Sequence, residues 1–267
     1  MYPVIASDLD GTLLSDKHVI SDFTAETLTL LIAKGVKFIF ATGRHHLDVA
    51  KIRDQLSIEA YMITSNGCRV HDMTGKLVAE HNLPEHVAQQ LFAIRYHDPQ
   101  VLTHVYQNDN WFMSRNDINL AGFYPASGFH YQLFKPEQLS GQGISKVFFT
   151  SDRHEVLEAL EKQLLDHYGD SLNLSFSLPL CLEVMPEGVS KGQALQQVAA
   201  ALGYTLADCL AFGDGMNDKE MLMMAGKGCV MANAHARLML ALPELQVIDA
   251  NDKDGVAHYL RQLYQIE

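Results

Sequence analysis

The sequence predicts an α/β protein whose doubly wound, Rossmann-like parallel sheet is interrupted by an inserted α+β domain. Near both ends of the chain, short apolar runs alternate with segments of helical spacing, which is typical of a parallel sheet covered by helices. In the middle of the chain this alternation stops, and aromatic residues and paired strand-like runs replace it. We therefore expect a core made of residues 1–83 and 187–267 and an inserted cap made of residues 84–186.

The first part of the core begins with an apolar strand over residues 3–7, which ends at an acidic turn. A helix is expected over residues 21–34, with Ser21 as its N-cap. The residues whose spacing predicts one shared face of this helix are Phe23, Thr27, Leu30 and Leu31. Two further strands, over residues 36–41 and 61–64, continue the alternation, and a helical stretch separates them.

In the inserted segment, the runs 101–106 and 111–114 flank residues 108–110, which predicts a β-hairpin. Further elements are expected as strands over 146–150, 172–177 and 182–185 and as a helix over 153–167. The aromatic residues of this segment are Tyr96, Tyr106, Trp111, Phe112, Phe123, Tyr124, Phe129, Tyr131 and Phe134. Aromatic side chains at such spacing usually fill a core; the alternative is that one of them, such as Trp111, stacks on a planar substrate ring.

The α/β alternation resumes after Pro186. The expected elements are helices over 190–202, 218–225 and 255–264 and strands over 210–212 and 229–231. The strand over 210–212, like the first strand of the chain, runs directly into an acidic turn. We therefore expect both acidic turns at the same edge of the predicted sheet.

The composition disfavours several classes of partner. Lys and Arg number 20 against 32 Asp and Glu, so the net charge is -12, which disfavours binding to nucleic acid or to an anionic membrane surface. No apolar run approaches the roughly 18 residues needed to cross a bilayer, and the N-terminus lacks the features of a signal peptide. The four cysteines lie far apart and form no CxxC pair, so we expect free thiols in a reducing compartment, the cytoplasm.

Asp8 and Asp10 carry the first chemical signal, because they directly follow the first apolar strand. Ligands of open α/β sheets bind outside the carboxyl ends of the strands, and residues two apart in an extended chain point the same way. Two close carboxylates stay ionised only beside a cation or a proton, and Mg²⁺ is a cation that suits oxygen ligands. The alternative is that these residues only form an Asp-Gly turn.

The second acidic cluster follows the strand over 210–212 and contains Asp214 and Asp218. Both side chains should therefore enter the same crevice as the first pair. The alternative is a Gly-rich turn in which Asp218 caps a helix, and the two interpretations are compatible.

Thr42, after the second strand, and Lys191, at the start of a helix, add a hydroxyl and an ammonium. These are the groups that hydrogen-bond and neutralise a phosphoryl oxygen. Taken singly, Thr42 is a turn residue and Lys191 a surface residue. Together with the two acidic clusters, in this order and mostly at strand ends, they predict a phosphoryl-binding site.

Four segments of the sequence resemble the motifs of the haloacid dehalogenase (HAD) superfamily of phosphohydrolases. They are DLDGTLL from Asp8, ATGR from Ala41, GVSKGQAL from Gly188 and GDGMND from Gly213. The segments SNG from Ser65 and DGVA from Asp254 are similar to the Cof-type branch, which carries a large α/β cap of the C2 type. The resemblance spans nearly the whole chain, although the cap matches in pattern more than in motif.

The resemblance implies a role for each of the first two carboxylates. Asp8 would attack phosphorus as the nucleophile, and Asp10 would protonate the leaving oxygen and then act as base toward water. To be an acid near neutral pH, Asp10 needs a raised pKa, which we expect a neighbouring carboxylate to provide. Asp at this position favours phosphatases and phosphomutases, with a hydrolase preferred, over the ion-pumping ATPases, which carry Thr there. Arg44, after the second motif, could reach the mouth of the site or only begin a surface helix.

The resemblance also implies a Mg²⁺ site and a phosphate cradle. The implied metal ligands are Asp8, the backbone carbonyl of Asp10, Asp214 and, as an outer or alternate ligand, Asp218. The groups implied to hold the phosphoryl oxygens are Thr42, Lys191, Asn217 and the backbone N–H groups from Leu9 to Gly11 and at Gly43.

The implied activity is a Mg²⁺-dependent phosphatase of small phosphorylated metabolites, with pyridoxal 5′-phosphate as the leading substrate and sugar phosphates following. Two alternatives stay open. One is a phosphomutase on the same scaffold, and the other is a module that only binds a phosphorylated metabolite, which has no need of a nucleophile such as Asp8. The sequence predicts neither a nucleic-acid partner nor a membrane partner, and it does not predict an oligomeric state.

Overall fold

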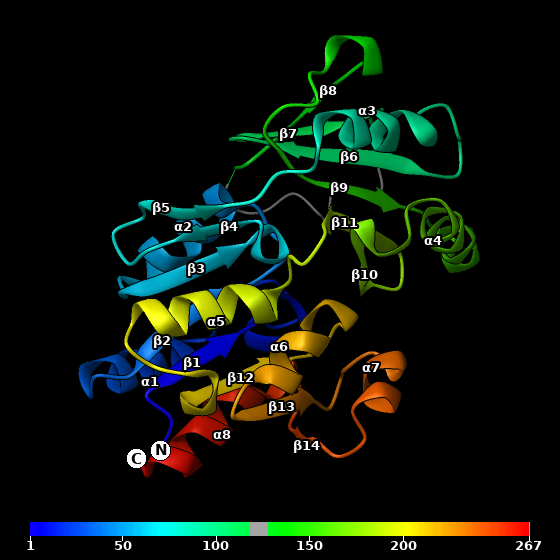
Figure 1. The fold of residues 1–267 in the computed structure, drawn as a ribbon. Helices are drawn as coiled ribbons and strands as arrows, with labels where there is room; N and C mark the ends of the chain where they lie inside the picture. Colours follow the sequence, from blue (N-terminus) through cyan, green and yellow to red (C-terminus); the bar gives the residue numbers. More distant parts are fainter. Residues whose placement is uncertain (118–127, 267) are drawn as a thin grey trace. The chain divides into compact units, whose positions relative to one another are not determined.

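The computed structural model describes residues 1–117 and 128–266, and it divides into two compact units (Figure 1). The first unit comprises Met1–Val78 and Ser190–Glu267, and the second comprises Ala79–Val189. Two segments that are distant in the sequence therefore build the first unit together.

The first unit is built on an eight-stranded sheet in the order β14-β13-β12-β1-β2-β3-β4-β5 (Figure 1). The strands are β1 Val4–Ser7, β2 Lys37–Ala41, β3 Ala60–Thr64, β4 Arg69–His71, β5 Leu77–Glu80, β12 Cys209–Gly213, β13 Lys227–Met231 and β14 Gln246–Ile248. All pairings from β14 to β3 are parallel, and β4 pairs antiparallel with β3. The predicted α/β class with a parallel-sheet core is thus confirmed.

The strand order reverses at β1, which lies between β2 and β12. Ser7 is level with Phe212 of β12 and with Phe40 of β2, so the three strands end together. A reversal of this kind opens a crevice at the carboxyl ends of the strands, where open α/β sheets bind their ligands.

The helices of the first unit are α1 Asp22–Ala33, α2 His46–Leu56, α5 Lys191–Ala201, α6 Lys219–Met224, α7 Ala236–Ala241 and α8 Gly255–Tyr264. Ser21 caps α1 as predicted, because its side chain accepts a hydrogen bond from the backbone N–H of Thr24. The buried face of α1 differs from the predicted one and consists of Thr24, Thr27, Leu28 and Leu31. The reason is that Phe23 packs outside the main core, against His258 of α8, with the ring centroids 4.7 Å apart.

Several short elements were not predicted: β4, β5, α7 and β14. β5 is mostly exposed and β14 has two exposed residues among its three, and both strands are too short to show a clear alternation. Their pairing is provided by neighbouring strands, which the local sequence does not reveal.

The second unit is a six-stranded sheet in the order β10-β11-β9-β6-β7-β8. Its strands are β6 Leu102–Gln107, β7 Asn110–Met113, β8 Tyr131–Leu133, β9 Ile144–Thr150, β10 Leu172–Leu178 and β11 Cys181–Pro186. Its helices are α3 Glu85–Ile94 and α4 His154–Tyr168. One apolar core joins the helices to the sheet through residues such as Leu91, Leu160, Val105, Phe149 and Leu182.

The predicted hairpin of the second unit is confirmed: β6 pairs antiparallel with β7, and Gln107 is level with Asn110. Asn108 in the intervening turn has φ 48°, a left-handed conformation that Asn tolerates. Trp111 packs in an apolar cluster with Tyr106 and Phe129. Phe123 and Tyr124 lie outside the described residues.

No helix among the residues that the structure describes is long and apolar enough to span a membrane. All four cysteines are free and buried, as the sequence predicts.

Candidate active site

The residues of the acidic motifs lie at the carboxyl edge of the first unit's sheet. Asp8 follows β1, Thr42 follows β2 and Asp214 follows β12, each directly after the last residue of its strand. Lys191 is the first residue of α5, whose preceding residue Ser190 caps the helix. Strand register and helix capping thus bring together four segments that are far apart in the sequence.

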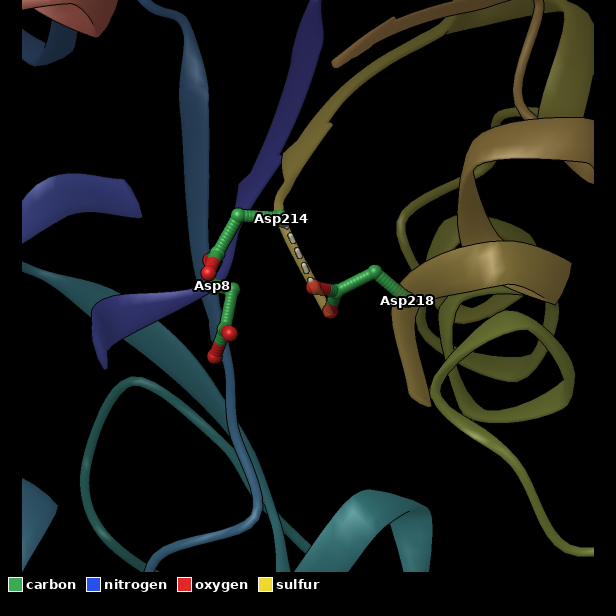
Figure 2. Close-up of side chains that lie close together, drawn as sticks. All are labelled: Asp8, Asp214 and Asp218. Atoms are coloured by element: carbon green, nitrogen blue, oxygen red, sulfur yellow. Dashed lines mark hydrogen bonds between the residues drawn. The ribbon is translucent and has the colours of Figure 1, made fainter. Parts of the chain in front are cut away.

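Asp8, Asp214 and Asp218 form a buried acidic triad. One carboxylate oxygen from each lies within 4.8 Å of the others. Figure 2 shows Asp8 and Asp214 at the ends of their strands, with Asp218 pointing back toward them. Burial and the charge of Asp218 raise the pKa of Asp8 well above its usual value and the pKa of Asp214 to about 7, because each carboxylate disfavours ionisation of the next.

Lys191 is the positive partner of this triad. Its Nζ lies 2.9 Å from Asp8 Oδ1 and 2.6 Å from Asp218 Oδ1, and the side chain is fully buried. Burial alone would lower the pKa of Lys191, but Asp218 and Asp8 raise it, so the ammonium is retained. Three carboxylates against one ammonium leave two formal negative charges in a buried site, which is the charge that a divalent cation would balance.

Asp218 differs from the other two acids because both of its oxygens accept hydrogen bonds from the chain itself. Oδ2 accepts from the backbone N–H groups of Asp214, at 3.0 Å, and Gly215, at 2.9 Å, while Oδ1 accepts from Lys191. The loop after β12 is therefore closed by Asp218. This arrangement suits a residue that orients the metal site from outside better than one that binds the metal directly.

Gly11 brings the backbone of the first motif close to Asp214. Its φ is 72°, and a Cβ at this position would lie 2.3 Å from Asp214 Oδ2. Thr12 donates a hydrogen bond to Asp214 Oδ1 at 2.6 Å. Oxygen donors, net negative charge and a backbone that leaves no room for a side chain together fit a small divalent cation such as Mg²⁺.

The carboxylate of Asp10 lies apart from this triad and is paired with Arg44. Arg44 donates from Nε to Asp10 Oδ2 and from Nη2 to Asp10 Oδ1, each at 2.6 Å, and from Nη1 to Asp48 Oδ2 at 2.9 Å. His18 Nδ1 lies 3.3 Å from Asp10 Oδ1. Residue spacing in the sequence does not reveal either contact, because Arg44 lies in the turn after β2 and His18 lies in a loop.

The pKa of Asp10 is therefore lowered, and the prediction that a neighbouring carboxylate raises it is wrong. Burial alone would raise the pKa, but the hydrogen bonds from Arg44 and His18 outweigh burial and hold it well below its usual range. Asp10 is thus held as a carboxylate. Arg44 does reach the site, which was one of the two interpretations of its position in the sequence.

The residues expected to hold phosphate lie around the same edge. Thr42 is buried, and its Oγ1 accepts a hydrogen bond from the backbone N–H of Arg44 at 3.2 Å. Gly43 lies in the turn between β2 and α2. The side chain of Leu9 is buried in the apolar core, so Leu9 can contribute only its backbone to a ligand.

Asn217 lies in the loop after β12 and reaches a residue that we did not place in the site. Its Nδ2 donates to Asn66 Oδ1 at 3.0 Å. Asn217 Oδ1 is buried and has no hydrogen-bond partner among the described residues, so a ligand or its water would satisfy it. Asn66 belongs to the Ser65-Asn66-Gly67 segment, which the sequence linked to the Cof-type branch without assigning it a role.

The chain is similar to known proteins along nearly its whole length. Residues 5–260 match the family of haloacid dehalogenase-like hydrolases. A Haemophilus influenzae protein is 43% identical over 267 residues, which cover 100% of this chain and 98% of that protein. A Yersinia pestis relative named HMP-PP phosphatase is 41% identical over 260 residues, covering 97% of this chain and 94% of the relative. A solved haloacid dehalogenase-like hydrolase from B. subtilis superposes with a TM-score of 0.87 at 27% identity, covering 98% of this chain and 99% of that one.

The matched family spans both sequence segments of the first unit and the whole of the second, and the relatives are similar along nearly their full length. The chain belongs to the haloacid dehalogenase-like hydrolases and is a phosphatase of small phosphorylated compounds.

Proposed function

We propose that the chain is a Mg²⁺-dependent phosphatase that works through an aspartyl-phosphate on Asp8. The observation that carries the proposal is the buried group of Asp8, Lys191, Asp214 and Asp218 at the carboxyl edge of the sheet. This group offers a nucleophile, a fixed ammonium and an oxygen-rich place for a cation. Phosphoryl transfer needs these parts, because its catalysis is mainly positioning and charge stabilisation.

The reaction has two steps. In the first, a carboxylate oxygen of Asp8 attacks phosphorus, the bond to the leaving oxygen breaks, and that oxygen takes a proton from Asp10. In the second, water attacks the phosphorus of the aspartyl-phosphate, its proton goes to Asp10, and phosphate leaves while Asp8 is restored. Lys191, through its contact with Asp8, orients the nucleophile and can neutralise charge on the phosphoryl group.

Asp8, Asp214 and the backbone carbonyl of Asp10 would hold Mg²⁺, with Asp218 outside the first set of ligands. When bound, Mg²⁺ supplies positive charge that keeps the carboxylates ionised and polarises a phosphoryl oxygen. Thr42, Asn217 and the backbone N–H groups at Leu9 and Gly43 would hold the remaining phosphoryl oxygens.

The pairing of Asp10 with Arg44 bears on the order of proton transfers. The contact favours the carboxylate, which is the form that accepts a proton from water in the second step. To act as the acid in the first step, Asp10 must leave Arg44 and take up a proton from solvent when substrate binds, because only the protonated carboxyl can give a proton to the leaving-group oxygen.

Pyridoxal 5′-phosphate is the substrate that we favour from the sequence resemblance, and sugar phosphates are the alternative. HMP-PP is a further candidate substrate, because the Yersinia pestis relative is named for it. We also propose that the second unit, inserted between the second and third motifs, selects the substrate. The four free cysteines support a reducing location, the cytoplasm.

The test is release of inorganic phosphate from a panel of esters that includes these compounds, with Mg²⁺ and with EDTA. We expect release only with Mg²⁺, and we expect Asp8→Asn to reduce kcat by on the order of 10³-fold or more. Circular dichroism of the variant controls for folding. Substantial activity in a folded Asp8→Asn protein, or indifference to EDTA, would remove the assigned mechanism. Isomerised product without phosphate release would indicate a phosphomutase, and binding without turnover would indicate a binding module.

A further inference from the structure

The turn after β3 has an unusual backbone. Ser65, Asn66 and Gly67 have φ values of 49°, 57° and 104°, so three successive residues are left-handed. Two of them carry a side chain, which makes this conformation costly for an L-residue. Both are buried, so the turn is not a mobile surface feature. Strain of this kind persists only where surrounding contacts fix the backbone.

The contacts that fix the turn come from three of the four segments assigned to phosphate binding: the loop after β2, the start of α5 and the loop after β12. The backbone N–H of Asn66 donates to the carbonyl of Thr42 at 3.0 Å, and that of Ser65 donates to the carbonyl of Arg44 at 2.9 Å. Gly67 lies so close to the N-cap of α5 that a Cβ would be 2.5 Å from the carbonyl oxygen of Ser190. The turn therefore packs against the residue that precedes Lys191.

The third segment, the loop after β12, is contacted through the side chain of Asn66. Asn66 Oδ1 accepts one N–H of Asn217 at 3.0 Å, which leaves the second N–H of that amide for another acceptor. This hydrogen bond, donated to a fixed neighbour, removes the rotational freedom of the Asn217 amide. The left-handed backbone places the Asn66 side chain where it can do this.

We propose that Asn66 is a positioning residue that orients the Asn217 amide toward the phosphoryl oxygens. The inference rests on the proposed function, because it assigns Asn217 to the phosphate cradle. The competing explanation is that Asn stands at this position only because it tolerates a left-handed backbone. The two explanations differ in what removal of the side chain does.

Asn66→Gly separates them, because Gly adopts a positive φ without strain and removes the side chain. We expect the variant to lose only the stability that the buried side chain contributes, without a penalty from the backbone. We expect kcat/KM to fall and the inhibition constant of orthovanadate to rise, each on the order of fivefold, which is the effect of one lost neutral hydrogen bond. Asn66→Ala should lose as much activity and more stability, since it keeps the strain.

A double-mutant cycle with Asn217→Ala decides whether the effect passes through that amide. In the Asn217→Ala background, Asn66→Gly should cause no further loss. Wild-type activity in Asn66→Gly, or an equal loss in both backgrounds, would overturn the proposal.

The same cycle can be measured by calorimetric binding of orthovanadate in the presence of Mg²⁺. If the wild type binds vanadate but releases no phosphate, the proposed function fails while the positioning role is still tested. If the wild type neither turns over nor binds vanadate, both proposals fail.

Discussion

In EDTA, which keeps the proposed Mg²⁺ site empty, the stability of this protein should fall as the pH rises from 5 to 7. The cause is Asp214, whose pKa is raised from its ordinary value of 3.8 to about 7 by burial first and by Asp218 second, while the hydrogen bond from Thr12 opposes the rise. Between these two values the native state holds a proton that the unfolded chain has released. The stability that protonated Asp214 contributes to the native state is therefore fully present below pH 3.8, and it is lost as the pH rises to about 7.

The size of the effect follows from the shift. Each pH unit well below the raised pKa corresponds to about 1.4 kcal/mol for one group, but Asp214 is half ionised at pH 7, so the interval from pH 5 to pH 7 corresponds to about 2 kcal/mol. For a chain of this length that is a fall in Tm of about 4–8 °C. The raised pKa of Asp8 acts in the same direction.

The assay is thermal unfolding in EDTA and in Mg²⁺ at pH 5, 6, 7 and 8. Mg²⁺ should raise Tm more at pH 8 than at pH 5, because a proton on Asp214 competes with the cation. Asp214→Asn is the matched control, since it keeps the shape and the acceptor for Thr12 but cannot ionise. In EDTA its Tm should fall less over the same interval.

Two results would refute this reasoning. One is an equal dependence of Tm on pH in the metal-free wild type and in Asp214→Asn. The other is a Mg²⁺-induced rise in Tm that is the same at pH 5 and pH 8.

Three further predictions concern single contacts. Arg44→Met should lower the free energy of unfolding at pH 7 by about 2 kcal/mol in urea titrations, and the difference should vanish as acid protonates Asp10, whose lowered pKa stabilises the fold only above its unfolded value. Lys146→Met should cost about 3–5 kcal/mol by removing the ammonium that is paired with the buried carboxylate of Glu183, whereas the double variant with Glu183→Leu should recover most of that loss in the same assay. Gly11→Ala should abolish the Mg²⁺-induced rise in Tm, because its Cβ would lie 2.3 Å from a carboxylate oxygen of the acidic triad.

The sequence was sufficient to predict that Asp8, Thr42 and Asp214 lie at one edge of the sheet, because the apolar runs of the strands are regularly spaced. Apolar runs marked β1, β2 and β12, and Asp8, Thr42 and Asp214 come directly after them. Parallel strands that end together bring such residues into one crevice whatever the details of packing. The N-cap of α1 was also predictable, because Ser21 accepts a hydrogen bond from a backbone N–H only three residues away.

What the sequence could not predict depends on side-chain orientation and on distant neighbours. The pairing of Arg44 with Asp10 joins residues 34 positions apart through a choice of rotamers, and it reverses the direction of the pKa shift. The contact of Asn217 with Asn66 spans 151 positions. The buried face of α1 differs from the predicted one because Phe23 packs against His258 of α8, which is more than 200 residues away in the sequence.

The position of β1 in the sheet has a consequence for synthesis of the chain. Val4 is level with Cys209, so one edge of β1 has no partner until roughly 200 more residues have been made, which takes a ribosome roughly 10–40 s at typical rates. During that time β1 and β2 present an apolar strand edge of the kind that recruits other chains. The sheet of the first unit can therefore be completed only late in synthesis, once β12 has emerged.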